Sequence, residues 1–458
     1  MPAIETEFAI VGGGQCGVPL TRALSEAGRR VVLFEREHLG GSCVNFGCTP
    51  SKAAIASARL AHQIRRAGEF GLRVGSLEVD FPAVIAHARS FADAGRHSLE
   101  ESLRGHDNPR LIEASARLDG RDGERFRLVA GDRIVLAEQV VLNTGTRSAL
   151  PGIAGLALTR CLTAENWLDH DTLPEHLLML GGSYIGLEMA QFYRRMGSKV
   201  TLLTDGGQIA PREDADVAEV LLQAFSDEGI DVRLNADVVH VAHAADGVTL
   251  HLADGGEVAG SDLFLAVGRI PNLDGLGLET LGLTVPPGKP IKVDERSMTE
   301  LTGLYATGDI RGGAQFTHTA YDDFLILRSH FLGDDGRSTR RLVPYGMFTD
   351  PELGRVGLNE TEARALAPDA RIVRRDFASM GRAREMGQAK GFVKLVATAD
   401  GKRLLGATIL GESGAELVHE MVAMMNSDTN LATFRKGVHI HPTLAEGVHQ
   451  AVAEICAD

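Results

Sequence analysis

The sequence lacks several features that would assign it to a familiar class. It contains no run approaching the roughly 20 apolar residues of a membrane-spanning helix. Its 5 cysteines among 458 residues are too few for the disulfide scaffold of a small secreted protein. Positive charge is also scarce, since 47 lysines and arginines face 61 acidic residues and the formal net charge is −14. This balance argues against nucleic acid or an anionic membrane as the main partner.

The amino-terminal residues also lack the features of a targeting segment. MPAIETEFAIVGGG has no basic region, no long apolar segment and no small-residue cleavage site before a predicted strand begins. We therefore expect a cytoplasmic protein. At 458 residues the chain is too long for a single hydrophobic core, and about three domains are expected.

Two of the few cysteines stand together in residues 40 to 52, GGSCVNFGCTPSK. Cys43 and Cys48 enter a predicted helix, whose N-terminal N–H groups and positive dipole end stabilise a thiolate. Pro50 suits the first turn of that helix. A structural disulfide or half of a metal site is the alternative, but metal motifs usually bring a second ligand pair at closer spacing and none is present. The motif therefore predicts a redox-active disulfide.

A second feature is a repeated unit. Residues 8 to 35 follow the pattern strand, glycine turn, helix and strand, and residues 177 to 204 repeat it. Each copy continues through short strand patterns to a glycine, Gly145 in VVLNTG and Gly268 in LFLAVGR. The repeat predicts two nucleotide-binding domains of similar plan. The first is enlarged by the cysteine motif and by a predicted helical hairpin at about residues 50 to 107.

The first repeat carries the full dinucleotide-binding pattern. Gly12, Gly14 and Gly17 match G-x-G-x-x-G, which provides a tight turn, a close approach of backbone to a pyrophosphate and close helix packing. Glu35 ends the second strand 23 residues after Gly12, where a carboxylate can accept hydrogen bonds from a ribose. An isolated G-x-G-x-x-G can be a simple turn, but this context indicates a dinucleotide site.

The second repeat departs from this pattern at two points. Gly181, Ser183 and Gly186 put a serine in place of the middle glycine, and Thr204, followed by an aspartate, stands where the first repeat has its acid. No basic residue follows closely enough to predict a 2′-phosphate pocket, which favours NADH over NADPH. The arginines that could still reach a phosphate are Arg194, Arg195 and Arg212.

From Pro344 onward, strands alternate with helices and glycine-rich nucleotide turns are missing, which is typical of an α+β domain. Residues 291 to 310 before it predict two strands that end in a glycine turn. The predicted fold is therefore α/β, with two Rossmann-like dinucleotide-binding domains and an α+β C-terminal domain. The predicted domains are residues 1–149 with 270–338, residues 150–269, and residues 339–458.

Two dinucleotide sites beside a reactive disulfide imply an electron path from a nicotinamide to a flavin, then to the cysteine pair and a substrate. The order of motifs resembles the flavin-dependent pyridine nucleotide-disulfide oxidoreductases, the group of dihydrolipoamide dehydrogenase, glutathione reductase and mercuric reductase. The resemblance spans essentially the whole chain. Its motifs are the cysteine motif, GGSYIGLE, ATGD at 306 to 309, FTDPELGRVG at 348 to 357 and HIHPTLAE at 439 to 446.

The resemblance implies roles for the matching residues. Cys43 would be the interchange thiol that attacks the substrate, and Cys48 the charge-transfer thiolate against the flavin of FAD. Lys52 and Glu188 match an ion pair near flavin N5, for which a surface salt bridge is the alternative. Tyr184 resembles the side chain that covers the nicotinamide pocket, although a core tyrosine would show the same pattern.

Thiol–disulfide exchange also needs a base and an acid. His441 can serve as both near neutrality, and Glu446 can hold the orientation of its ring. In the family this histidine reaches the active site of the partner subunit, which implies a homodimer built mainly on the C-terminal domain. Asp309 would bind the ribityl chain of FAD, and His318 could either line the flavin or begin a helix.

The sequence leaves the electron acceptor open. CTPSK resembles dihydrolipoamide dehydrogenases and mercuric reductases, but a lone Cys456 in the tail and the histidine of HIHPTLAE argue against mercury. SKAAIASARLAH, GGAQFTHTAYDDF and PREDADVAE resemble the branch of mercuric reductases and reactive-chlorine-resistance proteins. The leading hypothesis is NAD(P)H-dependent reduction of a small disulfide such as lipoamide, or the reverse reaction. The alternatives are a metal-ion or oxidant-stress reductase, including copper(II) reduction, and a structural subunit of a multienzyme complex.

Overall fold

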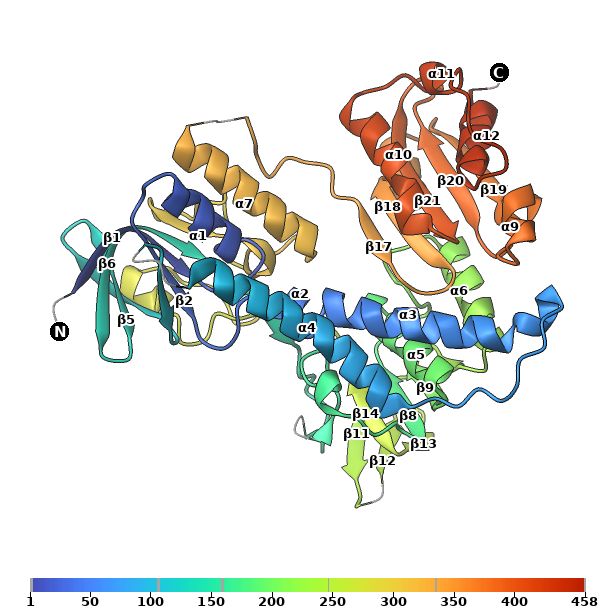
Figure 1. Ribbon diagram of the computed structural model, residues 1–458, viewed down its shortest axis with the longest axis horizontal. Helices are drawn as coiled ribbons and strands as arrows, with labels where there is room; N and C mark the ends of the chain where they lie inside the picture. Colours follow the sequence, from blue (N-terminus) through green and yellow to red (C-terminus); the bar gives the residue numbers. More distant parts are fainter. Residues whose placement is uncertain (1–2, 105–107, 158–159, 246, 334–335, 457–458) are drawn as a thin grey trace.

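The computed structural model of the chain describes residues 3–104, 108–157, 160–245, 247–333 and 336–456. Figure 1 shows three lobes, each built on its own sheet: a first lobe at the amino terminus, a middle lobe and a carboxy-terminal lobe. In the described ranges, no helix is long and apolar enough to cross a bilayer. The three lobes match the predicted architecture, and the predicted domain boundaries stay predictions.

The first lobe contains the strands β1 Ile4–Val11, β2 Val31–Glu35, β3 Arg110–Glu113, β4 Arg117–Asp122, β5 Arg125–Ala130, β6 Arg133–Leu142 and β16 Leu304–Ala306. They form one sheet in the order β3-β2-β1-β6-β5-β4, and β16 pairs with the end of β6. Alternate side chains of β1 point to opposite faces, so Phe8 and Ile10 enter one core while Ala9 and Val11 enter another. Both faces of the sheet are therefore buried.

The helices of this part of the chain are α1 Gly17–Glu26, α2 Gly41–Asn45, α3 Cys48–Arg65, α4 Phe81–Leu103 and α7 Thr317–Leu332. Helices α1 and α7 pack together over the first sheet. Helices α3 and α4 form the predicted hairpin, which extends toward the middle lobe (Figure 1). Asp80 caps α4 by accepting a hydrogen bond from the N–H of Ala83, so this helix begins where the sequence supplies a capping carboxylate.

The middle lobe repeats the plan of the first. Its strands are β8 His176–Leu180, β9 Lys199–Leu203, β10 Asp231–Arg233 and β14 Asp262–Leu265, in a parallel sheet of order β10-β9-β8-β14. Its remaining elements are α5 Tyr184–Met196, α6 Ala215–Asp227 and the antiparallel strands β11 Val238–His243, β12 Val248–Leu252 and β13 Glu257–Gly260. Strands β7 Thr146–Ser148 and β15 Arg269–Pro271 pair where the chain passes between the two lobes.

The carboxy-terminal lobe holds a five-stranded antiparallel sheet of order β17-β18-β21-β20-β19. Its strands are β17 Tyr345–Met347, β18 Glu352–Gly357, β19 Arg371–Asp376, β20 Phe392–Ala397 and β21 Leu404–Gly411. Its helices are α8 Glu360–Leu366, α9 Gly381–Glu385, α10 Gly414–Asn426, α11 Leu431–Phe434 and α12 Ala445–Ile455. The chain also has short 3-10 helices, η1 Ala67–Phe70, η3 Trp167–Asp169, η4 Leu278–Leu281, η5 Gly308–Arg311 and η6 Phe377–Ser379.

One strand prediction was wrong. Of the two strands predicted within residues 291 to 310, only β16 forms, and residues 291 to 303 are irregular. The polar groups of this segment are satisfied locally, because Asp294 accepts hydrogen bonds from the N–H groups of Arg296 and Met298. Such local side-chain bonds offer the backbone an alternative to a sheet ladder.

Candidate active site

A cavity of about 2350 Å³ lies where the three lobes meet. Both glycine turns, the cysteine motif and the ends of the parallel strands line it. Pockets for one drug-sized ligand are typically about 300–1,000 Å³, so this cavity has room for more than one extended ligand. The crevice at the carboxyl ends of parallel strands is also where dinucleotides bind in open α/β sheets.

The first glycine turn is built around bare backbone. Gly12 has φ of +107°, and a Cβ there would lie 2.3 Å from the carbonyl oxygen of Asn143. The Asn143 amide accepts a hydrogen bond from the N–H of Gly17 at 3.1 Å and so fixes the start of α1. Glu35 accepts a hydrogen bond from the N–H of Gly13 at 2.8 Å and lines the cavity. The turn thus fits a bound pyrophosphate, with the predicted acid beside it.

The second glycine turn has the same geometry. Gly181 has φ of +119°, and a Cβ there would lie 2.3 Å from the carbonyl oxygen of Ala266. The serine substitution has a structural explanation. In the first turn, a Cβ on Gly14 would lie 2.9 Å from the amide oxygen of Asn143, whereas Ala266 occupies the corresponding place in the second turn and has no such amide. Ser183 therefore has the room that Gly14 lacks.

The three arginines considered for a 2′-phosphate lie in different places. Arg194 donates to the carbonyl oxygens of Glu228 and Ser198, and Arg195 is buried in ion pairs with Glu228 and Asp350. Arg212 is exposed and lines the cavity near the end of β9. Arg212 is thus the one of these three that faces the predicted nucleotide site.

The cysteines occupy two consecutive helices. Cys43 lies in α2 and Cys48 is the first residue of α3, with Pro50 in its first turn as predicted. The Cys48 sulfur is 3.2 Å from the hydroxyl oxygen of Thr317. A hydrogen bond from Cys43, assisted by Thr317 and the charge of Lys52, lowers the pKa of Cys48 to about 6 against the effect of burial. Its own hydrogen bond to Cys48, together with burial, raises the pKa of Cys43.

Lys52 and Glu188 form a close pair beside the cysteines. The Nζ of Lys52 is 2.7 Å from Oε2 of Glu188, whose Oε1 accepts the N–H of Phe348 at 2.8 Å. The ammonium also lies 4.7 Å from the centre of the Phe348 ring. Burial alone would lower the pKa of Lys52, but Glu188 raises it, so the ammonium stays charged. The pair joins α3 to α5 and differs from an exposed surface salt bridge, because Glu188 is buried.

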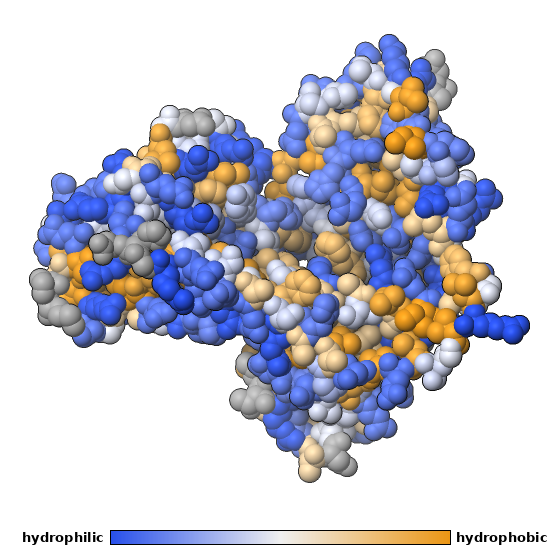
Figure 2. Space-filling view, viewed as in Figure 1, coloured by the Kyte–Doolittle hydropathy of each residue, from blue (hydrophilic) through white to orange (hydrophobic). Residues whose placement is uncertain are grey.

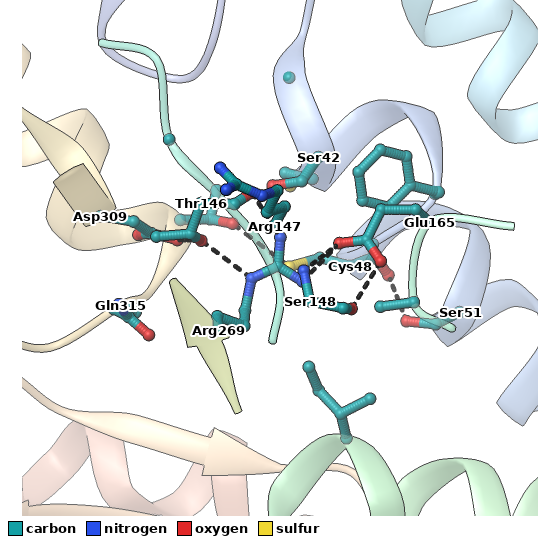
Figure 3. Close-up of a pocket in the computed structure, with 18 of the residues that line it drawn as sticks. Ser42, Cys48, Ser51, Thr146, Arg147, Ser148, Glu165, Arg269, Asp309 and Gln315 are labelled. Atoms are coloured by element: carbon teal, nitrogen blue, oxygen red, sulfur yellow. Dashed lines mark hydrogen bonds and ion pairs between the residues drawn. The ribbon is translucent and has the colours of Figure 1, made fainter. Parts of the chain in front are cut away.

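Asp309 also lines the cavity, where it lies next to Thr146 (Figure 3). It accepts a hydrogen bond from Thr146 at 3.0 Å, and burial raises its pKa. Arg269 donates to the hydroxyl of Thr146 at 2.9 Å and pairs with Glu165 at 3.1 Å. Gly145 and Gly268, with φ of +66° and +120°, flank the strands β7 and β15 and line the same cavity. Sequence reasoning missed Thr146, because only its pairing across the two lobes places it there.

Two further predicted residues line the cavity. Tyr184 is the first residue of α5, directly after the second glycine turn. His318 is the second residue of α7 and contacts the carbonyl oxygen of Pro344 at 2.7 Å, so it is both a helix-start residue and part of the cavity wall. Whether it lines a flavin stays a prediction. The neighbour that contacts the reactive sulfur is Thr317, which the sequence analysis did not single out.

His441 and Glu446 meet as predicted but lie away from the cavity. Nδ1 of His441 is 3.1 Å from both carboxylate oxygens of Glu446. Hydrogen bonds from the N–H of Thr443 and from His441 lower the pKa of Glu446. Neither residue lines the cavity that holds the cysteines. Within one chain, therefore, the structure does not bring the predicted base to the predicted thiols.

Two large apolar side chains close to His441 are exposed. Val438 and Ile440, which precede His441, are 100% and 79% exposed. In Figure 2 the most extensive hydrophobic surface lies near the outer end of the α3–α4 hairpin, whose exposed residues include Phe70, Leu72 and Val74, and smaller groups lie on the carboxy-terminal lobe. Contiguous exposed apolar surface of this kind marks interaction sites in soluble proteins.

Comparisons with known proteins agree with this geometry. A family model described as pyridine nucleotide-disulphide oxidoreductase matches residues 6–323, and a second, described as the dimerisation domain of that family, matches residues 343–452. The chain belongs to the pyridine nucleotide-disulphide oxidoreductases. It is accordingly an oxidoreductase acting on a sulfur group, of a family that uses FAD and a pyridine nucleotide. Both glycine turns described above fit a dinucleotide, because each lines the cavity at the start of a helix, α1 or α5.

Members of this oxidoreductase family from several organisms are similar over nearly their whole length. The probable pyridine nucleotide-disulfide oxidoreductase RclA of Escherichia coli is 31% identical over 97% of this chain and 98% of RclA. The dihydrolipoyl dehydrogenase of Bacillus subtilis is 29% identical over 97% of both chains. A copper(II) complex of RclA, described as an HOCl-induced flavoprotein disulfide reductase, has a TM-score of 0.89 and 30% identity, covering 99% and 100% of the two chains. LpdA of Mycobacterium tuberculosis has a TM-score of 0.90 and 27% identity, with the same coverage.

Proposed function

We propose that this enzyme uses NADH to reduce a small disulfide such as lipoamide, through FAD and the Cys43–Cys48 pair. One observation carries the proposal: the low-pKa sulfur of Cys48 lies beside Thr317 in the cavity that both glycine turns line. The alternative of a purely structural subunit gives no reason for such a sulfur. A cytoplasmic location, where thiols are kept reduced, suits the same chemistry.

In this proposal the chain holds FAD at the first turn. The backbone of Gly12, Gly14 and Gly17 would receive the pyrophosphate, Glu35 the adenosine ribose and Asp309 the ribityl chain. FAD, when bound, would accept a hydride from the nicotinamide and pass two electrons to the disulfide. The charged Lys52, held by Glu188, stabilises negative charge that arises beside Cys48.

The thiols then carry the electrons to the substrate. Because the pKa of Cys43 is raised, its thiol needs a base, and His441 of the partner subunit takes its proton. The Cys43 sulfur attacks the substrate disulfide, forms a mixed disulfide and releases one thiol, which receives the proton from the imidazolium. The Cys48 thiolate then attacks Cys43, restores the enzyme disulfide and releases the second substrate sulfur, which takes up a proton.

This scheme requires a homodimer, and three features support one. The carboxy-terminal lobe matches the dimerisation domain of the family. The residues before His441 are exposed and apolar. The His441–Glu446 pair also lies outside the cavity of its own chain, so a second chain is needed to complete the site.

For the nucleotide, we propose NADH. The carboxylate of Asp205, next to Thr204 at the end of β9, would repel a 2′-phosphate, whereas Arg212 would attract one. The value of kcat/KM should be higher for NADH than for NADPH in the wild type, and Arg212→Ala should lower it for NADPH alone. A wild type that prefers NADPH, with the preference lost in Arg212→Ala, would reverse this assignment.

A second candidate function is reduction of copper(II) or of an oxidised halogen species. It is favoured by the similarity to RclA, whose solved structures include a copper(II) complex. The two functions separate in one experiment, in which the flavin-loaded enzyme oxidises NADH or NADPH with lipoamide or with copper(II) as the acceptor. Rapid turnover with lipoamide supports the disulfide reductase. Turnover with copper(II) alone would assign the metal reductase, and turnover with neither would exclude both.

A further inference from the structure

The segment PREDADVAE, residues 211 to 219, joins two lobes through buried carboxylates. The side chain of Glu213 is 0% exposed, and its Oε1 accepts hydrogen bonds from the hydroxyls of Tyr184 at 2.7 Å and Tyr345 at 2.9 Å. Its Oε2 lies 3.7 Å from the guanidinium of Arg355, which is 3% exposed. One carboxylate thus links α5 of the middle lobe to β17 and β18 of the carboxy-terminal lobe.

Both tyrosines are hydrogen-bond donors in this arrangement. Burial and the nearby charge of Glu213 raise the pKa of both side chains, to about 12 for Tyr345. The hydroxyls therefore stay protonated at neutral pH. Their acceptor is the carboxylate of Glu213, which is paired with the guanidinium of Arg355. Hydrogen bonds to a charged group are stronger than those between neutral groups.

Tyr184 lines the cavity between the second glycine turn and the residues that pair with Lys52. It directly follows the second glycine turn, and Glu188 stands four residues later on the same face of α5, paired with Lys52. The ring of Tyr184 is also stacked near Phe316, at 6.4 Å between centroids and 21° between planes, and Phe316 stacks on Tyr345. Tyr184 thus lies between the second turn and Glu188 along α5, where a nicotinamide directed at the Lys52–Glu188 pair would meet its ring.

We propose that Glu213 is a positioning residue that latches Tyr184 across the nicotinamide site and couples this latch to the carboxy-terminal lobe through Tyr345 and Arg355. The inference rests on the proposed binding of a pyridine nucleotide at the second turn. Entry of the nicotinamide displaces the ring and breaks the bond from Tyr184 to Glu213. Breaking this bond costs free energy, so the apparent dissociation constant of the nucleotide is higher than it would be without the bond.

The test is the binding of NAD⁺ and of NADP⁺ to the flavin-loaded enzyme, measured by calorimetry. Tyr184→Phe keeps the ring and removes the latch, so it should lower the dissociation constant by about tenfold, the factor for one hydrogen bond to a charged group. Glu213→Gln removes the charge but keeps an acceptor oxygen, so it should lower the dissociation constant by a smaller factor. The double variant should bind no more tightly than Tyr184→Phe alone, because both changes act on one interaction.

Asp214→Asn is the matched control. Asp214 also bridges the two lobes, through Lys394 at 3.0 Å and the hydroxyl of Thr361 at 2.8 Å, but it has no hydrogen bond to Tyr184. The affinity of the Asp214→Asn variant for the nucleotide should equal that of the wild type. An equal gain in Asp214→Asn, or no gain in Tyr184→Phe, would overturn the latch while the proposed function stands. A wild type that binds neither nucleotide would overturn both.

Discussion

At the scale of single residues, Cys43 and Cys48 carry the same side chain and have opposite pKa shifts. The thiol of Cys43 donates a hydrogen bond to the sulfur of Cys48, which stabilises the Cys48 thiolate and makes Cys43 harder to ionise. Thr317 and Lys52 add to the stabilisation of Cys48. In the reduced pair, therefore, Cys48 is the sulfur that loses its proton first, while Cys43 stays protonated.

The ultraviolet absorbance of the thiolate should report this division. In the reduced protein we expect the Cys48 thiolate above about pH 6 and the thiol below it, since its pKa is lowered from 9.0 to about 6. Cys48→Ala should remove this titration. Cys43→Ala should move the midpoint upward, because the donated hydrogen bond is lost. A midpoint that stays at the same pH in Cys43→Ala would contradict the role given to that bond.

Thr317 should contribute in the same direction. Thr317→Val keeps the volume of the side chain but removes the hydroxyl 3.2 Å from the Cys48 sulfur. We expect the Cys48 midpoint to rise, by an amount equivalent to about 1 kcal/mol for one hydrogen bond. Thr317→Ser retains the hydroxyl and serves as the control, with a midpoint near that of the wild type. Identical midpoints in the valine and serine variants would show that the Thr317 hydroxyl does not lower the pKa of Cys48.

At the scale of helices and strands, the features that the sequence predicts correctly are those that depend on neighbouring residues. Both glycine turns, the α3–α4 hairpin and the start of α3 at Cys48 follow from neighbouring residues, and the structure has them. The partners brought in by packing could not be predicted. Thr317 lies 269 positions from Cys48, and the N–H of Phe348 lies 160 positions from Glu188. These partners lie in the motifs QFTHT and FTDPE, but no rule of sequence spacing predicts that either motif lies beside the cysteines.

Side-chain periodicity also failed where local hydrogen bonds compete with the sheet. Residues 291 to 310 predict two strands, but the first does not form, because Asp294 accepts hydrogen bonds from the N–H groups of Arg296 and Met298. In contrast, the short strand patterns that lead to VVLNTG include one continuous strand, β6, which ends at Leu142 just before the turn at Gly145. Its two halves pair with different neighbours, β5 at the beginning and β16 at the end.

The end of α5 offers a stability prediction. Arg195 is buried, with its guanidinium 2.6 Å from Glu228 and 2.8 Å from Asp350 in the carboxy-terminal part of the chain. Arg195→Met should lower the free energy of unfolding by about 3–5 kcal/mol, because two buried carboxylates lose their cation. Guanidinium-induced unfolding measures this loss. Arg194→Met, which removes bonds to backbone carbonyl oxygens only, should cost about 1–2 kcal/mol. Equal losses in the two variants would contradict the special role of the ion pairs.

At the scale of the whole molecule, the two groups of predicted catalytic residues lie in different places within the single chain. Cys43 and Cys48 line the cavity between the lobes, and His441, the proposed base, lies outside it in the carboxy-terminal lobe, after the exposed Val438 and Ile440. A two-fold dimer can complete both sites at once, since each chain would give its base to the other. The proposed mechanism therefore makes activity a property of pairs of chains.

Co-expression of two inactive variants tests this property. Cys43→Ser and His441→Gln should each be nearly inactive as homodimers. In a mixed dimer, one site would combine the intact Cys43 of one chain with the intact His441 of the other, and random pairing should restore about a quarter of wild-type activity. Activity that stays at background in the mixture, with mixed dimers present by native mass spectrometry, would show that thiols and base act within one chain.

The two glycine turns share one backbone geometry and differ in a coupled pair of positions, Gly14 with Asn143 and Ser183 with Ala266. A side chain at residue 14 would crowd the amide that holds the N–H of Gly17, whereas Ser183 faces an alanine that makes no such bond. The residue that fits at the middle of each turn therefore depends on a residue at the end of a different strand. Redesign of either nucleotide site would have to change both positions together.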